Sequence, residues 1–288
     1  MPTLRDIRRK INSIKSTQTI TRTMKMVASS RLRRAQEELE RIRNYANRFE
    51  ELKERLIPSL KKATHPLLKQ KDEEKRALIF VIASDRGLCG SFNVNVNLAT
   101  ENFINSVKDK YEDIALYVVG KKVKDYFVRR HVSIVKEWIE LRRIEAHHVE
   151  EMTKDLISYY ENDDFQRIYG VYTFYRSPIR QEVKLEEMIP ILPREEREPI
   201  EYLYEPSEEY IVNHFIPRYL ETKIRYMILN SQTSEHASRM NAMENATNNC
   251  GELIRMLTLI YNKKRQENIT KEMLDIVGGA EAVKTVRY

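Results

Sequence analysis

The residues most able to carry chemistry lie in a short turn, residues 85–90, which follows an apolar run. The turn reads DRGLCG, with Gly87 and Gly90 on either side of a thiol. Glycine-rich turns that open a helix bind phosphates, so this one is a candidate nucleotide site. The Lys-Ser or Lys-Thr ending of a P-loop is missing, and so is the third glycine of a dinucleotide fingerprint. We therefore interpret the two glycines as parts of a tight strand-to-helix turn.

Cys89 in this turn is a conceivable nucleophile, but none of the six histidines lies in a motif that would make it the base. His147 and His148 are adjacent, and adjacent residues of a helix point in different directions, which is poor spacing for metal ligands. Neither paired carboxylates nor a zinc signature stands out. The sequence therefore predicts no catalytic, metal or cofactor site.

The turn belongs to a region in which strands and helices alternate. Residues 77–84 (ALIFVIAS) and 114–120 (IALYVVG) are continuous apolar runs, typical of strands buried on both faces. Further extended pieces are expected at 133–139, 165–175 and 182–192, and helices at 93–111, 121–130 and 147–160. This order predicts a Rossmann-like α/β sheet with an antiparallel hairpin at its end. A proline- and glutamate-rich connector follows at residues 193–209.

A long helical pattern precedes this region. Counting by three and four from Leu4 gives a mostly apolar seam that keeps its phase as far as Leu56. A 3.5-residue repeat suits a left-handed coiled coil, and the nearest prolines, Pro2 and Pro58, lie at its ends. The seam consists of Leu4, Ile7, Ile11, Ile14, Gln18, Thr21, Lys25, Ala28, Leu32, Ala35, Leu39, Ile42, Ala46, Phe49, Lys53 and Leu56.

The partner of this helix is expected within residues 207–277. That stretch has a similar seam, made of Met240, Met243, Thr247, Cys250, Ile254, Leu257 and Tyr261. The alternative is two ordinary helices of a large bundle, but bundle helices rarely run past about 25 residues without a break. The predicted fold is a long antiparallel coiled coil of N-terminal (1–58) and C-terminal (207–288) helices, with a central α/β domain and its connector (59–206) inserted between them.

The first seam turns polar at Gln18, Thr21 and Lys25, where Met24 and Met26 flank it. Polar seam positions fix the register of a coiled coil. A weakened seam also marks a place where the helices unwind or meet a third surface. The sequence leaves both interpretations open.

The charge is uneven. Net charge is +7, and residues 1–34 hold ten basic side chains against one acid, Asp6. Such a segment favours an acidic partner: nucleic acid, anionic lipid or an acidic protein surface. There is no run of 18 apolar residues and no apolar core of a secretory signal. The basic N-terminus resembles a mitochondrial presequence, but its unbroken heptad phase argues against a removed peptide. Two cysteines, Cys89 and Cys250, favour a reducing compartment.

Several stretches together resemble a known family. They are residues 7–11 (IRRKI), 17–21 (TQTIT), 24–28 (MKMVA), 84–93 (SDRGLCGSFN), 202–206 (YLYEP), Ser234-Glu235, Arg239-Met240, 261–266 (YNKKRQ), 269–273 (ITKEM), 275–277 (DIV) and Gly279-Ala280. In this order they resemble the γ subunits, the central rotor shafts, of rotary F-type ATP synthases. The resemblance covers the chain from end to end.

The resemblance implies a rotor subunit that couples proton (or sodium) flow to ATP synthesis. Its coiled coil would stand within three α and three β subunits, and its α/β domain would contact the ε subunit and the membrane-embedded c ring. Turning of the c ring would turn the shaft and drive the β-subunit sites through their states. The resemblance also implies that the chain binds no nucleotide and is not itself an enzyme. It would be peripheral, on the cytoplasmic face of a bacterial plasma (inner) membrane.

The resemblance also assigns site residues. Those implied to contact the β subunits or the ring are Met24, Lys25, Arg239, Arg265, Gln266, Thr270, Glu272 and Asp275, and those implied to face the c ring are Tyr202 and Glu205. Asp275 replaces the usual glutamate, and the tail after Ala280 is unusually polar. The cysteine-bearing regulatory insert of chloroplast versions is absent, so redox control is not expected.

Two other classes compete with this reading. A basic coiled-coil protein that binds nucleic acid would favour aromatic residues interleaved with the basic ones, and residues 1–44 have none. A small α/β enzyme with helical extensions would need catalytic residues that the sequence does not nominate.

Overall fold

The structure is a computed structural model that describes residues 3–61, 64–141, 144–193 and 202–285, the last six of them by backbone only. It contains two compact units, Met1–Val27 with Ala242–Tyr288, and Ala28–Asn241. Helix α1 (Leu4–Ser59) and helix α5 (Glu208–Thr285) contribute to both units. We call the first the stalk unit and the second the α/β unit, and describe each by itself.

The stalk unit is an antiparallel helix pair. The hydroxyls of Thr21 and Thr247 lie 2.8 Å apart, and the Lys25 ammonium lies 2.7 Å from the Glu244 carboxylate. As the residue number rises along α1, the residue number of the contacted position on α5 falls, so the two helices run antiparallel. The seam positions Ile7 and Ile11 are buried, and the seam positions of α5 from Met243 to Tyr261 are buried or half-buried. The predicted antiparallel coiled coil is confirmed.

In the α/β unit the same two helices again run antiparallel. Phe49 of α1 stacks on Phe215 of α5 with ring centroids 5.5 Å apart, whereas Leu39 lies in one cluster with Leu229, farther along α5. Every position of the first predicted seam, from Leu4 to Leu56, is buried or half-buried. The 3.5-residue repeat of α1 therefore faces a partner throughout its length.

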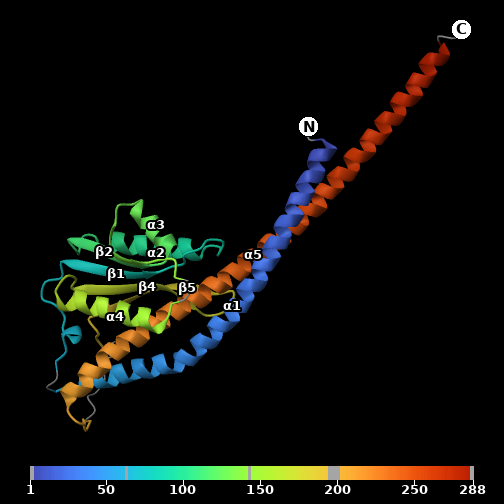
Figure 1. Cartoon of the computed structure of the whole chain (residues 1–288). Helices are drawn as coiled ribbons and strands as arrows, with labels where there is room; N and C mark the ends of the chain where they lie inside the picture. Colours follow the sequence, from blue (N-terminus) through green and yellow to red (C-terminus); the bar gives the residue numbers. More distant parts are fainter. Residues whose placement is uncertain (1–2, 62–63, 142–143, 194–201, 286–288) are drawn as a thin grey trace. The chain divides into compact units, whose positions relative to one another are not determined.

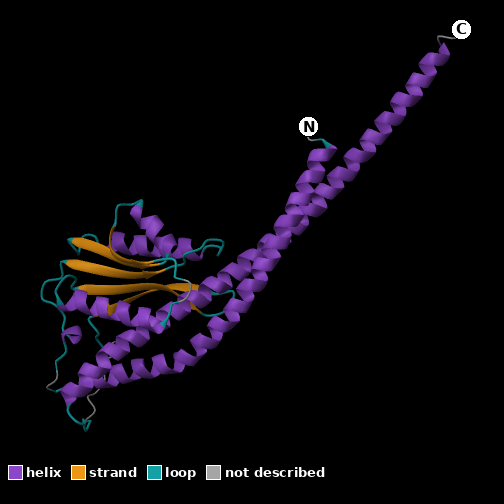
Figure 2. Ribbon diagram, viewed as in Figure 1, coloured by secondary structure: helices purple, strands orange, loops and turns teal. Residues whose placement is uncertain are grey.

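The sheet has the strand order β3-β2-β1-β4-β5 (Figures 1 and 2). The first four strands are parallel and β5 is antiparallel to β4, so the predicted terminal hairpin is confirmed. The elements are η1 (Pro66–Leu68), β1 (Arg76–Ile82), α2 (Phe92–Val107), β2 (Asp113–Val119), α3 (Lys121–Val128), β3 (Ser133–Trp138), α4 (Ala146–Glu161), β4 (Arg167–Tyr175) and β5 (Gln181–Ile189).

Helices cover both faces of this sheet. Helices α2 and α3 cover one face of β1 and β2 (Figure 1). Val96 of α2 and Phe127 of α3 pack there against the strands. Leu156 of α4 and Ile224 of α5 pack on the other face. Because both faces are covered, every residue of β1 after Arg76 is buried, as its continuous apolar sequence predicts.

Element boundaries differ little from those predicted. Helix α1 ends at Ser59, one residue past Pro58, and α5 continues past residue 277 to Thr285. The predicted connector 193–209 lies partly outside the described residues, as does its cluster of glutamates between 194 and 201. None of the helices in the described ranges combines the length and apolarity needed to cross a bilayer.

Candidate partner-binding surfaces

The turn after β1 is held by its own polar groups. The buried Ser84 donates its backbone N–H to Asn93 Oδ1 (3.1 Å) and its hydroxyl to the carbonyl of Arg86 (2.7 Å). Gly90 has a positive φ of 57°, which a side chain rarely adopts. The bonds of Ser84 to Asn93 and to Arg86 tie the two ends of the turn together, which supports the interpretation as a structural turn.

Cys89 does not have the surroundings of a nucleophile. Its thiol is buried, and burial raises the pKa of the Cys89 thiol. Reactive cysteines lie in exposed, electropositive surroundings that lower this pKa. The sulfur accepts a hydrogen bond from Asn93 Nδ2 at 3.1 Å, which ties it into the turn.

The two adjacent histidines differ from the prediction. Their ring centroids lie 3.8 Å apart, so the expectation that His147 and His148 point in different directions is wrong. The reason is a helix cap, because His148 Nδ1 turns back to accept a hydrogen bond from the Glu145 amide at 3.0 Å. Within the described ranges, no group of three or more His, Cys, Asp or Glu side chains is arranged to hold a metal ion.

The C-terminal end of α5 forms an exposed surface of the stalk unit. Among the residues whose side chains the structure describes, Lys264 is the last half-buried one of α5, and residues 265–279 are all exposed. This end carries five of the predicted site residues, Arg265, Gln266, Thr270, Glu272 and Asp275. It also exposes apolar side chains that were not predicted as contacts, Ile269, Met273, Leu274, Ile276 and Val277, with Ile276 72 % and Met273 64 % exposed.

The register of the helix pair explains this exposure. Thr21 lies opposite Thr247 and Lys25 opposite Glu244, so Leu4 at the start of α1 falls level with roughly residue 264 of α5. Apolar residues beyond that level have no described partner helix. The sequence contains a sign of this exposed end, because apolar residues of the C-terminal helix continue past residue 264, which lies level with Leu4 at the start of the first seam.

Met24 and Lys25 lie on α1 in the stalk unit. Met24 is half-buried, whereas Met26 is 68 % exposed. Lys25 pairs with Glu244 of α5, and the two side chains are 38 % and 46 % exposed. The polar seam residues therefore bond across the helix pair, because Gln18 Nε2 also donates to the Thr247 carbonyl (3.3 Å). This favours the register interpretation of the polar interruption.

The basic side chains of residues 1–34 face solvent. Nine of the ten are exposed, and the tenth, Lys25, is half-buried. Arg5, Arg8 and Arg9 begin this basic surface in the stalk unit, and Arg31, Arg33 and Arg34 continue the charge along the α1 part of the α/β unit. A helix that keeps its seam for a partner helix and displays this charge outward is suited to an acidic protein surface.

Arg239 lies in the α/β unit and is 9 % exposed. It donates to the carbonyls of Arg86 (3.3 Å) and Gly87 (3.2 Å) and pairs with Glu235 at 2.6 Å. In this unit the predicted contact residue thus makes internal contacts. Burial raises the pKa of the Glu235 carboxyl, and the neighbouring Arg239 opposes that shift.

Tyr202 and Glu205 lie just before α5 in the α/β unit. Both are exposed, Tyr202 by 38 %, and the Tyr202 ring lies 6.2 Å from that of Tyr204. Leu203 between them is 91 % exposed. The structure therefore brings these residues together as one exposed, partly apolar segment.

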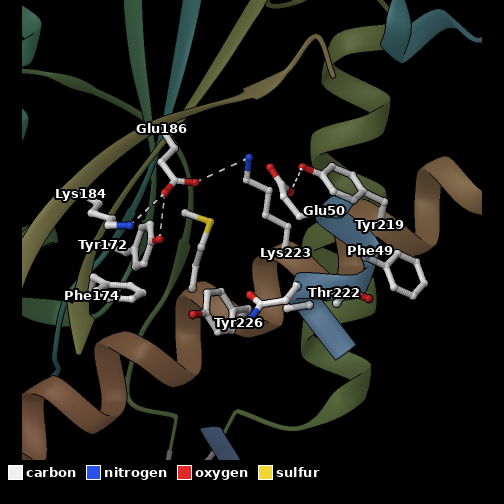
Figure 3. A pocket seen from close by; sticks show the side chains of 13 residues that line it. Phe49, Glu50, Tyr172, Phe174, Lys184, Glu186, Tyr219, Thr222, Lys223 and Tyr226 are labelled. Carbon is white, nitrogen blue, oxygen red and sulfur yellow. Dashed lines mark hydrogen bonds and ion pairs between the residues drawn. The ribbon is translucent and has the colours of Figure 1, made fainter. Parts of the chain in front are cut away.

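A cavity of about 250 Å³ lies among α1, β4, β5 and α5 (Figure 3). Its charges are paired: Glu186 lies 3.8 Å from Lys223 and 3.9 Å from Lys184, and the Tyr219 hydroxyl donates to Glu50 at 2.7 Å. The Lys184 ammonium also lies 4.1 Å from the centre of the Phe174 ring. These contacts join the two long helices to the edge of the sheet.

These features define a class of protein. It is an antiparallel coiled coil with an inserted α/β domain, which in its described part displays charged and apolar helix surfaces.

Comparisons with known proteins agree with this class. A family model described as ATP synthase matches residues 3–283. The ATP synthase gamma chain of Syntrophobacter fumaroxidans is 40 % identical over 291 residues, covering 99 % of this chain and 100 % of the relative. That of Moorella thermoacetica is 39 % identical over 286 residues, with 99 % and 100 % covered.

Solved structures show the same fold. The central stalk and c-ring structure of the Tetrahymena thermophila mitochondrial ATP synthase contains a chain with a TM-score of 0.60 and 26 % identity, covering 79 % of this chain and 99 % of that one. A chain of the Euglena gracilis mitochondrial ATP synthase has a TM-score of 0.72 and 20 % identity, with 99 % and 96 % covered. The chain belongs to the ATP synthase gamma-chain family. The family resemblance of the sequence is confirmed, and nothing supports the nucleic-acid alternative.

Proposed function

We propose that the chain is the central rotor of an F-type ATP synthase and couples ion-driven turning of a c ring to ATP synthesis or hydrolysis at β-subunit sites. The observation that carries this proposal is the exposed end of α5, residues 265–279, with its apolar side chains. Large exposed apolar patches mark interaction sites. A sleeve formed by α and β subunits would cover this end on all sides.

The chain would supply no catalytic residue to the complex. Its part in catalysis would be mechanical, because each β subunit would meet a different side of the rotating helix pair. The outward basic surface of α1 would meet acidic β-subunit segments, with Met24 and Lys25 near them. Arg265, Gln266, Thr270, Glu272 and Asp275 would contact the ring, and Arg239 would act in coupling.

The α/β unit would face the membrane side of the complex. The exposed segment with Tyr202 and Glu205 would contact the c ring, and the ε subunit would bind the same unit. The chain would then be peripheral, at the cytoplasmic face of a bacterial inner membrane.

Contacts between rotor and ring would have to be individually weak. An exposed ion pair contributes of the order of 1 kcal/mol or less, so no single pair would hold the rotor at one angle. The exposed basic side chains of α1 suit such contacts, because water screens each of them.

Reconstitution with α and β subunits tests the proposal. The full chain should give a complex with three α, three β and one copy of the chain. Removal of residues 265–288, or the triple substitution Met273→Ser, Ile276→Ser and Val277→Ser, should lower its ATPase activity. Ile179→Ser, at an 89 % exposed site in the α/β unit, is the matched control and should leave the activity unchanged. Failure of the full chain to assemble would contradict the proposal.

A further inference from the structure

We infer that residues 230–239 of α5 occupy the crevice in which open α/β sheets bind ligands, and thereby lock the sheet onto α5. This segment reads NSQTSEHASR, and nine of its ten side chains, all but Ala237, are polar or charged. Asn230, Thr233 and Ser234 are nevertheless fully buried, and Ser231 is 2 % exposed. Buried polar groups are costly unless they are hydrogen-bonded, so their partners show what the segment does.

The crevice is defined by the strand order. From β1 the chain moves to β2 and then β3 on one side, and it returns to β4 on the other side of β1. Helices α2 and α3 cover one face of the sheet and α4 the opposite face. The chain leaves β1 toward β2 through α2, and it leaves β4 toward β5 on the opposite side through a hairpin, so the strand order reverses between β1 and β4. In open α/β sheets this switch point is the usual place for a ligand.

The carboxyl end of β4 is bonded by α5. Strand β1 pairs with β4 only as far as Val171, so the β1-facing groups of Thr173 and Tyr175 lack a strand partner. The Thr173 amide donates to Ser231 Oγ (3.1 Å), and the Ser234 hydroxyl donates to the Thr173 carbonyl (3.3 Å). The Tyr175 amide donates to Asn230 Oδ1 (3.2 Å). Side chains of α5 thus form the hydrogen bonds with Thr173 and Tyr175 that a neighbouring strand would otherwise form.

The carboxyl end of β1 is bonded by the same segment. Arg239 donates to the carbonyls of Arg86 and Gly87 in the turn after β1, and Glu235 holds its guanidinium at 2.6 Å. The turn therefore aims carbonyl oxygens at a buried cation. Carbonyl oxygens at this position would repel a phosphate and attract a cation, so the position suits the arginine.

This inference rests on the proposed function in one respect. If the chain is a rotor, force applied to the α/β domain has to reach α5 without the domain slipping around the helix. Apolar packing is non-directional and resists such slipping less than directional hydrogen bonds do. The bonds from residues 230–239 are directional and lie at the ends of two strands, so they fix the angle of the domain about α5.

Amide hydrogen exchange on the full chain tests the bonding. Asn230→Ala and Ser231→Ala should each speed exchange at Tyr175 and Thr173, respectively, by at least tenfold. Thr233→Ala is the matched control, because Thr233 is equally buried in the same turn of helix but donates to Leu229 within the helix (2.7 Å). Unchanged exchange at both amides, or the same acceleration in Thr233→Ala, would overturn the inference.

Ion transport per ATP hydrolysed, measured in the assembled synthase, tests the mechanical role. Arg239→Gln should lower this ratio severalfold, and Arg239→Lys, which keeps a cation and donors, should retain part of it. The charge exchange of Glu235→Arg with Arg239→Glu should not restore it, because a carboxylate cannot donate to the Arg86 and Gly87 carbonyls. Rescue by the exchange, or a normal ratio in Arg239→Gln, would overturn the inference. Failure of the unmodified chain to couple would instead contradict the proposed function.

Discussion

Lys25 offers a test that separates a contact within the helix pair from a contact with a partner. Its ammonium lies 2.7 Å from Glu244 of α5, so a charge reversal at this position has two effects. Lys25→Glu removes an ion pair inside the stalk unit. It also presents a negative charge to any acidic surface that approaches α1.

The first effect is small because both side chains are partly exposed, by 38 % and 46 %. Loss of an exposed ion pair costs about 0.2–1 kcal/mol. Two like charges about 4 Å apart in water repel each other by about 1 kcal/mol. The free energy of unfolding should therefore fall by about 1–2 kcal/mol, and by much less in 1 M salt, where the screening length is about 3 Å.

The double exchange Lys25→Glu with Glu244→Lys restores opposite charges across the pair. Unfolding of the full chain in urea should show that this variant regains most of the lost stability. ATP-driven ion transport in the assembled complex should remain impaired, because the proposed acidic partner surface would still meet Glu at position 25. The exchange of Arg48→Glu with Glu51→Arg, an exposed ion pair within α1 and outside its basic segment, is the control for altered helix charge. If the Lys25–Glu244 exchange restored transport together with stability, Lys25 would act only inside the stalk unit.

Three further predictions concern the α/β unit and are measured by urea unfolding of the full chain. Gly120→Ala should lower the free energy of unfolding by about 3 kcal/mol, because φ of Gly120 is +108° and the new Cβ would lie 2.5 Å from the Ala83 carbonyl oxygen. Gly278→Ala is the control and should not lower the free energy of unfolding, because the space around Gly278 is open. Leu156→Ala, in the core between α4 and the sheet, should cost about 2–5 kcal/mol, and an effect below about 1 kcal/mol would show that this core is not packed as described. Burial, with the nearby charges of Arg239 and Arg31, lowers the pKa of His236 to about 4. The unfolded chain binds a proton at this histidine below about pH 6.5, whereas the folded protein does so only near pH 4. The folded protein therefore loses stability as the pH falls from about 6.5 to 4. His236→Gln should remove about 2 kcal/mol of the loss between pH 7 and pH 5, and an unchanged pH dependence in this variant would contradict the reasoning.

The long helices could be predicted because their pattern is local and periodic. Each apolar position of α1 follows the previous one by three or four residues, and the pattern continues from Leu4 to Leu56 without a change of phase. Strands β1 and β2 could be predicted for a related reason, since burial on both faces leaves room only for apolar residues such as those of Leu78–Ile82. In both cases the partner surface imposes a simple rule on residue type.

The buried polar segment of α5 could not be predicted in this way. Asn230, Ser231 and Ser234 look like solvent-facing residues of a helix, since polar side chains are mostly exposed. Their burial depends on strand ends more than 50 residues earlier in the chain, which no local pattern reveals. The orientation of His148 was missed for a similar reason, because a cap hydrogen bond outweighed the ordinary divergence of neighbouring side chains.

The two helices therefore use polar residues for two different purposes in the two units. In the stalk unit, Thr21 and Lys25 bond to side chains of the opposite helix, and a shift of one turn would leave both of them without these partners. That arrangement fixes the axial register of the pair, which an apolar seam of repeating heptads does not do by itself. In the α/β unit, residues 230–239 bond to the strand ends and fix rotation of the sheet about the helix. The proposed rotor needs both kinds of constraint, since slip along the helix axis and slip around it would each lose the angle that a c ring would impose.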